Sequence, residues 1–230
     1  MGGIRVYLDP LVLALLALVF LGDAGPADIG ARLTLLGILL GSVFLHEVGH
    51  AWMARSRGLR VGGIYLHLVP FAYVERGTPA EELRVALAGP AVNLVLSVVL
   101  LLVPGVASSF PWTDPARWLD APLHAALAIN LLMAIVNLIP ALPADGGRAL
   151  RAALLLKLPP GTAYQRTARV GTFVGAALLG VAAVWRRWPE AAAVAVMGVF
   201  LIMVAWREAR MGQLERRAAR ARHRQQEEDA

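Results

Sequence analysis

The stretch LTLLGILLGSVFLHEVGHAWM, residues 33–53, decides the fold class, because it places two histidines and a glutamate inside an apolar run. The run is long enough for a membrane-spanning helix, which needs about 20 residues. Ionisable side chains are costly in such a helix and by default mark a functional site. On a helix, His46 and His50 lie one turn apart on the same face, with Glu47 beside His46. This pattern is typical of zinc sites that activate water, where two neutral imidazoles hold the metal and a nearby carboxylate takes a proton.

The composition places the chain among membrane proteins. Apolar residues make up 58% of the 230 residues, and the mean hydropathy is +0.61. We expect an all-α polytopic membrane protein with about six transmembrane helices. The candidate spans are residues 6–21, 33–53, 83–103, 122–139, 170–185 and 191–206. Residues 59–77 are broken by glycines and a proline and rich in β-formers, which predicts a small cytoplasmic-side β-hairpin or a re-entrant segment.

The first candidate span has a second interpretation. Arg5 followed by the apolar core 11–21 and then small residues is also the order of a signal peptide. Cleavage there would leave the next loop on the same outer side. The predicted orientation of the later spans is therefore the same under both interpretations, and whether the segment is retained stays open.

Basic residues set the predicted orientation. Most Lys and Arg side chains fall on the loops and ends of one side, which predicts that both termini are cytoplasmic. We expect a multi-pass protein of the plasma membrane, from a prokaryote. The sequence pI of about 10.7 then reflects orientation. No separate basic domain is present, so we expect no nucleic-acid partner. Residues 1–206 are predicted to form one membrane domain and residues 207–230 a cytoplasmic arginine-rich tail, a helix near anionic headgroups or a docking site for a regulatory protein.

A third metal ligand is expected from an oxygen donor or a further histidine, because the chain has no cysteine. Asp145 is the candidate, in NLIPALPADGGRAL at residues 137–150. His46 and His50 lie roughly 8 to 14 Å below the cytoplasmic end of their helix. The prolines before Asp145 end the fourth span and the glycines after it allow a sharp fold, so its carboxylate can return to that depth.

Two asparagines fall in the same predicted layer. AGPAVN at residues 88–93 puts Gly89, Pro90 and Asn93 one to two turns into the third span, and Asn137 ends the fourth. A glycine permits close helix approach, and a buried amide either bonds a neighbouring helix or faces a substrate. Both roles stay open for the two asparagines.

Together HEVGH, GPAVN and NLIPALPADGG resemble the site-2 protease family of intramembrane zinc metalloproteases, over most of residues 40 to 150. Members often carry PDZ or CBS domains, and this chain has room for neither, so we expect a short form. Ala144 stands where the family often has leucine. By the resemblance, one Zn2+ per chain is held by His46, His50 and Asp145, Glu47 is the catalytic base, and Asn93 and Asn137 line the substrate-binding site.

The activity implied is hydrolysis of a peptide bond within or next to a transmembrane segment of a membrane-anchored protein, near the cytoplasmic face of the lipid bilayer. Two alternatives stay open: a catalytically silent zinc-binding scaffold or transporter, and a membrane protease whose third ligand is a downstream glutamate. A regulatory protein or a second copy of the chain is a further partner. His67, in the predicted hairpin, is either a structural histidine or a group near the metal.

Overall fold

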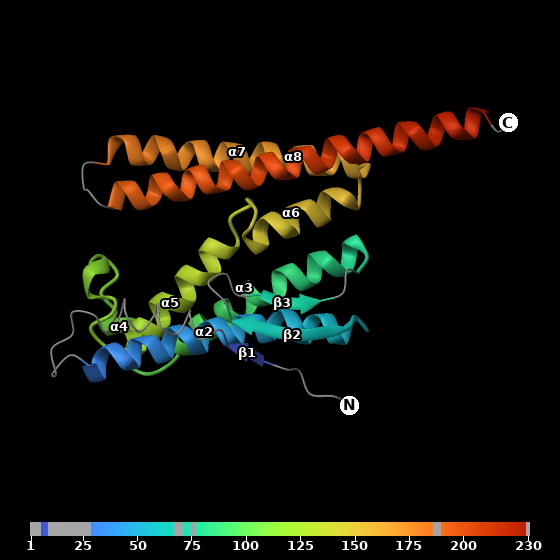
Figure 1. Cartoon of the computed structure of the whole chain (residues 1–230). Helices are drawn as coiled ribbons and strands as arrows, with labels where there is room; N and C mark the ends of the chain where they lie inside the picture. The colour runs from blue at the N-terminus through green and yellow to red at the C-terminus, as the bar shows by residue number, and fades with distance from the viewer. Residues whose placement is uncertain (1–5, 9–28, 67–70, 75–76, 186–189, 229–230) are drawn as a thin grey trace. The chain divides into compact units, whose positions relative to one another are not determined.

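The computed structural model describes residues 6–8, 29–66, 71–74, 77–185 and 190–228. The elements (Figure 1) are β1 (Val6–Leu8), α2 (Ile29–Ser56), β2 (Val61–Leu66), β3 (Phe71–Val74), α3 (Pro79–Leu101), α4 (Val106–Ser109), a 3-10 turn (Pro115–Arg117), α5 (Pro122–Asn137), α6 (Asp145–Leu155), α7 (Pro160–Val184) and α8 (Glu190–Glu228). They form two compact units, which are described separately. The first comprises Met1–Gly77 and Arg84–Asn137, and the second Thr78–Leu83 and Leu138–Ala230.

Four helices of the described chain are long and apolar enough to cross a membrane: α2, α3, α7 and the Ala191–Ala221 part of α8. They coincide with four predicted spans. The fifth match, α5, is apolar but has only 16 residues. The predicted first span is wrong at its start, because Val6–Leu8 form a strand, and its remainder lies outside the described residues. A mostly helical membrane protein is therefore confirmed, whereas the count of six spans is not.

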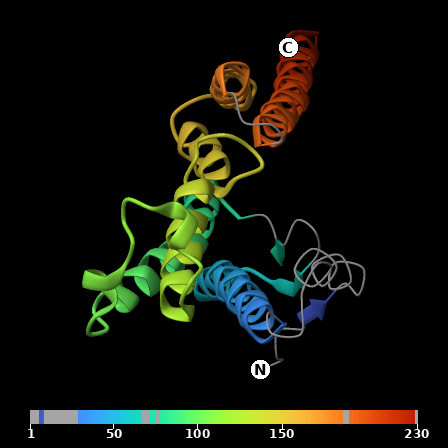
Figure 2. The same ribbon diagram turned by 90° about the vertical axis from the view of Figure 1, so that its left-hand side faces the viewer.

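A three-stranded sheet in the order β1-β2-β3 lies beside α2 (Figure 2). Strands β2 and β3 are antiparallel, which confirms the predicted hairpin within residues 59–77. Strand β1 joins it in parallel, with Val6 opposite Ile64. Ile64 is buried and packs in one cluster with Ala51, Phe44 and Val48 of α2. This apolar contact fixes the sheet on the helix that carries the histidines; His67 lies outside the described residues.

Helix α3 begins with a capping box. The Thr78 hydroxyl and backbone N–H donate to Glu81 Oε2 at 2.8 and 2.7 Å, and Pro79 occupies the first helical position. A proline at this position costs no hydrogen bond, because the first N–H groups of a helix have no partner within the helix. The box satisfies such end groups and fixes where α3 starts.

The connection between α3 and α5 has a small apolar core of its own. Phe110 packs with Val106 and with Leu127 and Ala128 of α5. The Trp118 indole N–H donates to the carbonyl of Pro111 at 3.0 Å. This core joins the two helices that carry the buried asparagines of the first unit.

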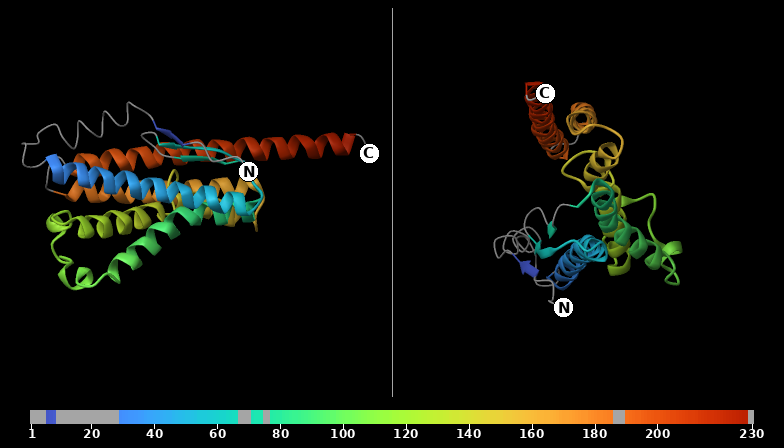
Figure 3. Two further views of the ribbon diagram at one scale, coloured as in Figure 1. Left: turned by 90° about the horizontal axis from the view of Figure 1, so that it is seen from below. Right: turned by 90° about the vertical axis from the view of Figure 1, so that its right-hand side faces the viewer.

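In the second unit, α7 and α8 run antiparallel and side by side (Figure 3). The Gly171 and Gly175 pair predicts close helix packing within the chain, and this is confirmed: a Cβ on Gly175 would lie 2.7 Å from the carbonyl oxygen of Gly198. For the similar pair Gly37 and Gly41, a Cβ would meet no described atom within 4 Å. With 39 residues, α8 is about 58 Å long, longer than the roughly 30 Å apolar layer of a bilayer. The predicted tail is thus a continuation of this helix.

A partly buried ion pair joins α6 to α8 within the second unit. Arg151 donates to the buried carboxylate of Glu208 at 3.2 Å, and its guanidinium lies 5.8 Å from the ring centre of Tyr164 on α7. A buried charge without its partner is strongly destabilising, so the pair fixes α6 against the α7–α8 hairpin.

We expect Gly175→Ala to lower the stability of the α7–α8 hairpin, because the new methyl group would overlap Gly198 and Ile202. Overpacking of this kind costs about 1–3 kcal/mol. The control is Gly180→Ala, where the methyl group meets nothing within 4 Å and the helix gains propensity. Thermal unfolding in detergent should give a lower Tm for Gly175→Ala only. Equal Tm values for the two variants would contradict the packing described here.

Candidate metal centre

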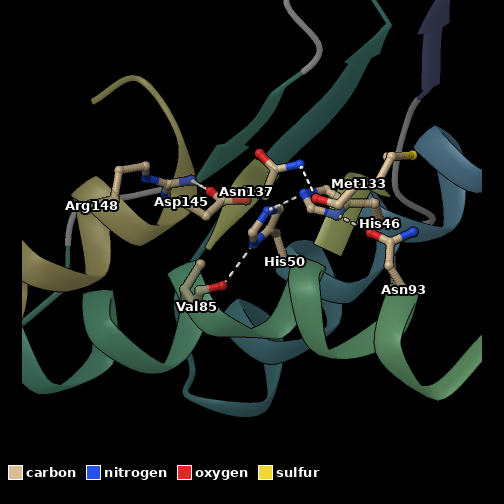
Figure 4. Close-up of polar contacts among 8 residues, drawn as sticks. All are labelled: His46, His50, Val85, Asn93, Met133, Asn137, Asp145 and Arg148. Carbon is tan, nitrogen blue, oxygen red and sulfur yellow. Dashed lines mark hydrogen bonds and ion pairs between the residues drawn. The ribbon is translucent and has the colours of Figure 1, made fainter. Parts of the chain in front are cut away.

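Helix α2 brings three potential metal ligands together, as its sequence predicts. His46, Glu47 and His50 are all buried, and one ligand atom from each lies within 4.8 Å of the others. The two imidazole rings are nearly perpendicular, at 84°. Their Nε2 atoms are 3.2 Å apart (Figure 4). Both rings therefore present the same nitrogen to one shared point.

The opposite nitrogens fix the tautomer of each ring. Nδ1 of His50 lies 2.7 Å from the backbone carbonyl of Val85, and Nδ1 of His46 lies 2.5 Å from Oδ1 of Asn93. Both oxygens only accept hydrogen bonds, so each Nδ1 carries the hydrogen. Each Nε2 is then left with its lone pair, the form that ligates a metal.

Two lone pairs that face each other across 3.2 Å repel unless a cation lies between them. Two imidazole nitrogens bound to one tetrahedral zinc ion at about 2.0–2.1 Å are about 3.3–3.4 Å apart. The observed separation is close to this value. The donor set therefore fits a divalent metal ion without rearrangement of the rings.

Two glycines make room for this arrangement at the α2–α3 contact. A Cβ on Gly89 would lie well under 3 Å from Nε2 of both histidines. A Cβ on Gly49 would lie 2.8 Å from Val92 and 2.9 Å from the Ala88 carbonyl oxygen. Each helix thus has a glycine where the other comes closest, which confirms the close approach predicted for Gly89.

Asp145 is the first residue of α6, in the second unit. Its carboxylate is buried and accepts a hydrogen bond from Arg148 at 2.8 Å. Cβ atoms on Gly146 and Gly147 would overlap the backbone of Leu138 and Leu142. The sharp fold predicted around this aspartate is therefore present, while its role as third ligand stays a prediction.

The two predicted substrate-binding asparagines differ in their surroundings. Asn93 is 0% exposed, and its Nδ2 donates to Oδ1 of Asn130 at 2.8 Å. Asn137 is partly buried and donates to the carbonyl of Met133 on its own helix at 3.0 Å. Both Oδ1 and Nδ2 of Asn93 thus form hydrogen bonds inside the protein, Oδ1 with His46 and Nδ2 with Asn130. Substrate binding by either asparagine stays a prediction.

Asn130, which was not predicted as a site residue, lies on α5 and donates from Nδ2 to the Ser42 hydroxyl of α2 at 3.0 Å. The available signal was an amide in the middle of the apolar run LHAALAINLLMAIV, residues 123–136. A buried polar group in a membrane helix has a partner in the bundle. That signal predicts a hydrogen bond but does not name the partner.

These features define a multi-pass membrane protein with a buried histidine–glutamate–histidine metal site, and comparisons with known proteins agree. The sequence profile of peptidase family M50 matches residues 34–114. A protein named zinc metalloprotease from Methanocaldococcus jannaschii is 32% identical over 146 residues, 61% of this chain and 39% of that protein. A relative from Synechocystis sp. is 36% identical over 162 residues, 65% of this chain and 41% of the relative.

A solved structure, the site-2 protease from Methanocaldococcus jannaschii, matches with a TM-score of 0.61 and 26% identity, over 91% of this chain and 92% of that one. The chain is thus similar to members of peptidase family M50 and to a site-2 protease. It spans about two fifths of the length of the two curated relatives.

We expect Gly89→Ala to weaken metal binding, because the methyl group would occupy the space into which both Nε2 atoms point. The matched change Gly37→Ala on α2 adds a methyl group that meets no described atom within 4 Å. Metal analysis of the purified proteins should show reduced zinc in Gly89→Ala and wild-type zinc in Gly37→Ala. Full zinc in Gly89→Ala would refute the placement of the metal between the two rings.

Proposed function

We propose that this protein is an intramembrane zinc metalloprotease. It would hydrolyse a peptide bond within or next to a transmembrane segment of a membrane-anchored protein, near the cytoplasmic face. The observation that carries the proposal is the pair of imidazoles whose Nδ1 hydrogens are fixed and whose Nε2 lone pairs converge. This pair lies in a helix long and apolar enough to cross a membrane. The relative named zinc metalloprotease and the site-2 protease likeness favour zinc and peptide hydrolysis.

His46 and His50 would hold the zinc ion together with Asp145, one ion per chain. The donor types support this set, since zinc sites that catalyse hydrolysis combine histidines with a carboxylate and leave one position open. When bound, zinc supplies the Lewis acidity that lets water lose a proton near neutral pH.

Glu47 would act as the general acid–base group. Its carboxylate takes a proton from the attacking water and returns it to the amine that leaves. Its position beside His46 supports this role, as does its burial, because bulk water does not compete for the proton in an apolar surrounding. Asn93 would serve the same chemistry by holding the His46 ring in place.

Substrate binding would use the small sheet. A transmembrane helix shields its peptide bonds with its own hydrogen bonds, so the scissile region must unwind before hydrolysis. Strands β1 and β3 lie at the two edges of the described sheet, and an unwound segment can add to such an edge as a further strand. The packing of β2 on α2 supports this, because it places the sheet on the helix that carries Glu47.

Orientation follows from charge. Arg55 lies in the last turn of α2, just after the histidines, and Arg57 and Arg60 follow it. Loops rich in Lys and Arg stay in the cytoplasm. We therefore place the metal site in the cytoplasmic half of the membrane and both chain termini in the cytoplasm.

Glu47→Gln should retain zinc but lose activity, because the amide keeps the side-chain size and cannot accept the proton from water. We expect cleavage of a co-expressed single-span reporter to fall by a factor of about 100 or more. The control is the same change at Glu82, in the first turn of α3, which should cleave at the wild-type rate. Retained cleavage in Glu47→Gln would refute the mechanism, and zinc-loaded wild type that cleaves no membrane protein would favour a zinc-binding scaffold.

Asp145→Ala should lower zinc affinity by removing one of three protein ligands. The control is Asp120→Ala, which removes an exposed ion pair with Arg117. Zinc affinity is measured by competition with a chromogenic chelator in detergent. If Asp145→Ala binds zinc as tightly as the wild type, the third ligand is another residue, such as a downstream glutamate.

A further inference from the structure

We propose that Asn130 is a positioning residue that sets which ring nitrogen of His46 carries the hydrogen. Asn130 lies on α5 and acts through Asn93 on α3. By this action it keeps Nε2 of His46 free of hydrogen and available to a metal. The inference rests on the metal site of the proposed function and adds a residue from a third helix to it.

The first step is the contact between Asn93 and His46. Oδ1 of Asn93 accepts from Nδ1 of His46 at 2.5 Å, and Nδ2 of Asn93 donates to Oδ1 of Asn130 at 2.8 Å. A side-chain amide can turn by 180° and exchange its oxygen and nitrogen with almost no change in shape. Turned in this way, Asn93 would present N–H groups to His46. The ring would then accept at Nδ1 and carry its hydrogen on Nε2, where it cannot bind a metal.

Asn130 prevents that turn. If Asn93 turned, its oxygen would face Oδ1 of Asn130, and two acceptors would meet. Asn93 is 0% exposed and Asn130 is 4% exposed, so water does not replace the lost hydrogen bond. Leaving a buried polar group unsatisfied is costly. The orientation of Asn130 therefore determines that of Asn93.

The orientation of Asn130 is itself fixed by the backbone. Its Nδ2 donates to the carbonyl of Ala126 at 2.9 Å, and that oxygen can only accept. The same nitrogen donates to the Ser42 hydroxyl at 3.0 Å, which uses its own hydrogen on the carbonyl of Ile38 at 2.8 Å. Two backbone carbonyls, neither of which can donate, thus fix the direction of every hydrogen bond up to His46.

The variant Asn130→Leu tests this role, because leucine has a similar size and offers no acceptor to Asn93. Ser97→Ala is the matched control, because it removes a buried hydroxyl one turn from Asn93. This hydroxyl donates to the backbone carbonyl of Asn93 at 2.8 Å and is not part of the hydrogen-bond chain from Asn130 to His46. Asn130→Asp is a conservative variant. As a neutral acid, its carbonyl oxygen accepts from Asn93 and its O–H donates to Ala126.

Two measurements are made on each protein. Nitrogen-15 NMR of histidine-labelled, metal-free protein in micelles reports the tautomer of His46, and competition with a chelator reports zinc affinity. We expect the Nδ1–H tautomer in the wild type, in Ser97→Ala and in Asn130→Asp. In Asn130→Leu we expect a population of the Nε2–H tautomer and zinc affinity lower by about 10–100-fold, as for other residues that orient metal ligands.

Two results would overturn the inference. One is the Nε2–H tautomer of His46 in the metal-free wild type, which decides the question even if Asn130→Leu fails to fold. The other is the Nδ1–H tautomer together with wild-type zinc affinity in Asn130→Leu. Wild-type protein that shows the expected tautomer but binds no zinc would instead refute the proposed function, so the two failures are distinguishable.

Discussion

The close approach of the Nε2 atoms of His46 and His50, which lie 3.2 Å apart, is the constraint on which the metal site depends. Uncharged imidazoles do not hold this position by themselves, because the facing acceptors repel. Hydrogen bonds at the opposite nitrogens, to Asn93 and to the carbonyl of Val85, impose it. Helix α3 is therefore as necessary to the site as α2, which carries the histidines. A metal ion between the rings turns the repulsion into attraction.

This constraint explains why polar and small residues gather in otherwise apolar helices. Gly89 leaves space for both rings, and Gly49 allows α3 to approach. Asn130 and Ser42 would be costly in a membrane helix as isolated groups, yet each has its hydrogen bonds satisfied by a neighbour. In the second unit, the polar contact between Arg151 and Glu208 likewise joins two helices, α6 and α8.

The sequence predicts those parts of the site that depend on residues close together in the chain. The helical period places His46, Glu47 and His50 on adjoining positions of one helix, and glycine at residue 89 signals close approach. The pairing of Val6–Leu8 with β2 could not be predicted, because these residues begin an apolar run and their partner lies far along the chain. Asn130 was missed for a similar reason: a single amide in an apolar helix indicates a hydrogen bond without identifying the helix that accepts it.

Zinc K-edge X-ray absorption of the purified protein tests the central claim, that the two imidazoles converge on one metal ion. We expect two imidazole nitrogens at about 2.0–2.1 Å from zinc, with oxygen ligands and no sulfur in the rest of the shell, because the chain has no cysteine. A spectrum that requires a single imidazole, or none, would contradict this claim. In that case the facing nitrogens of His46 and His50 would need another explanation than a shared metal.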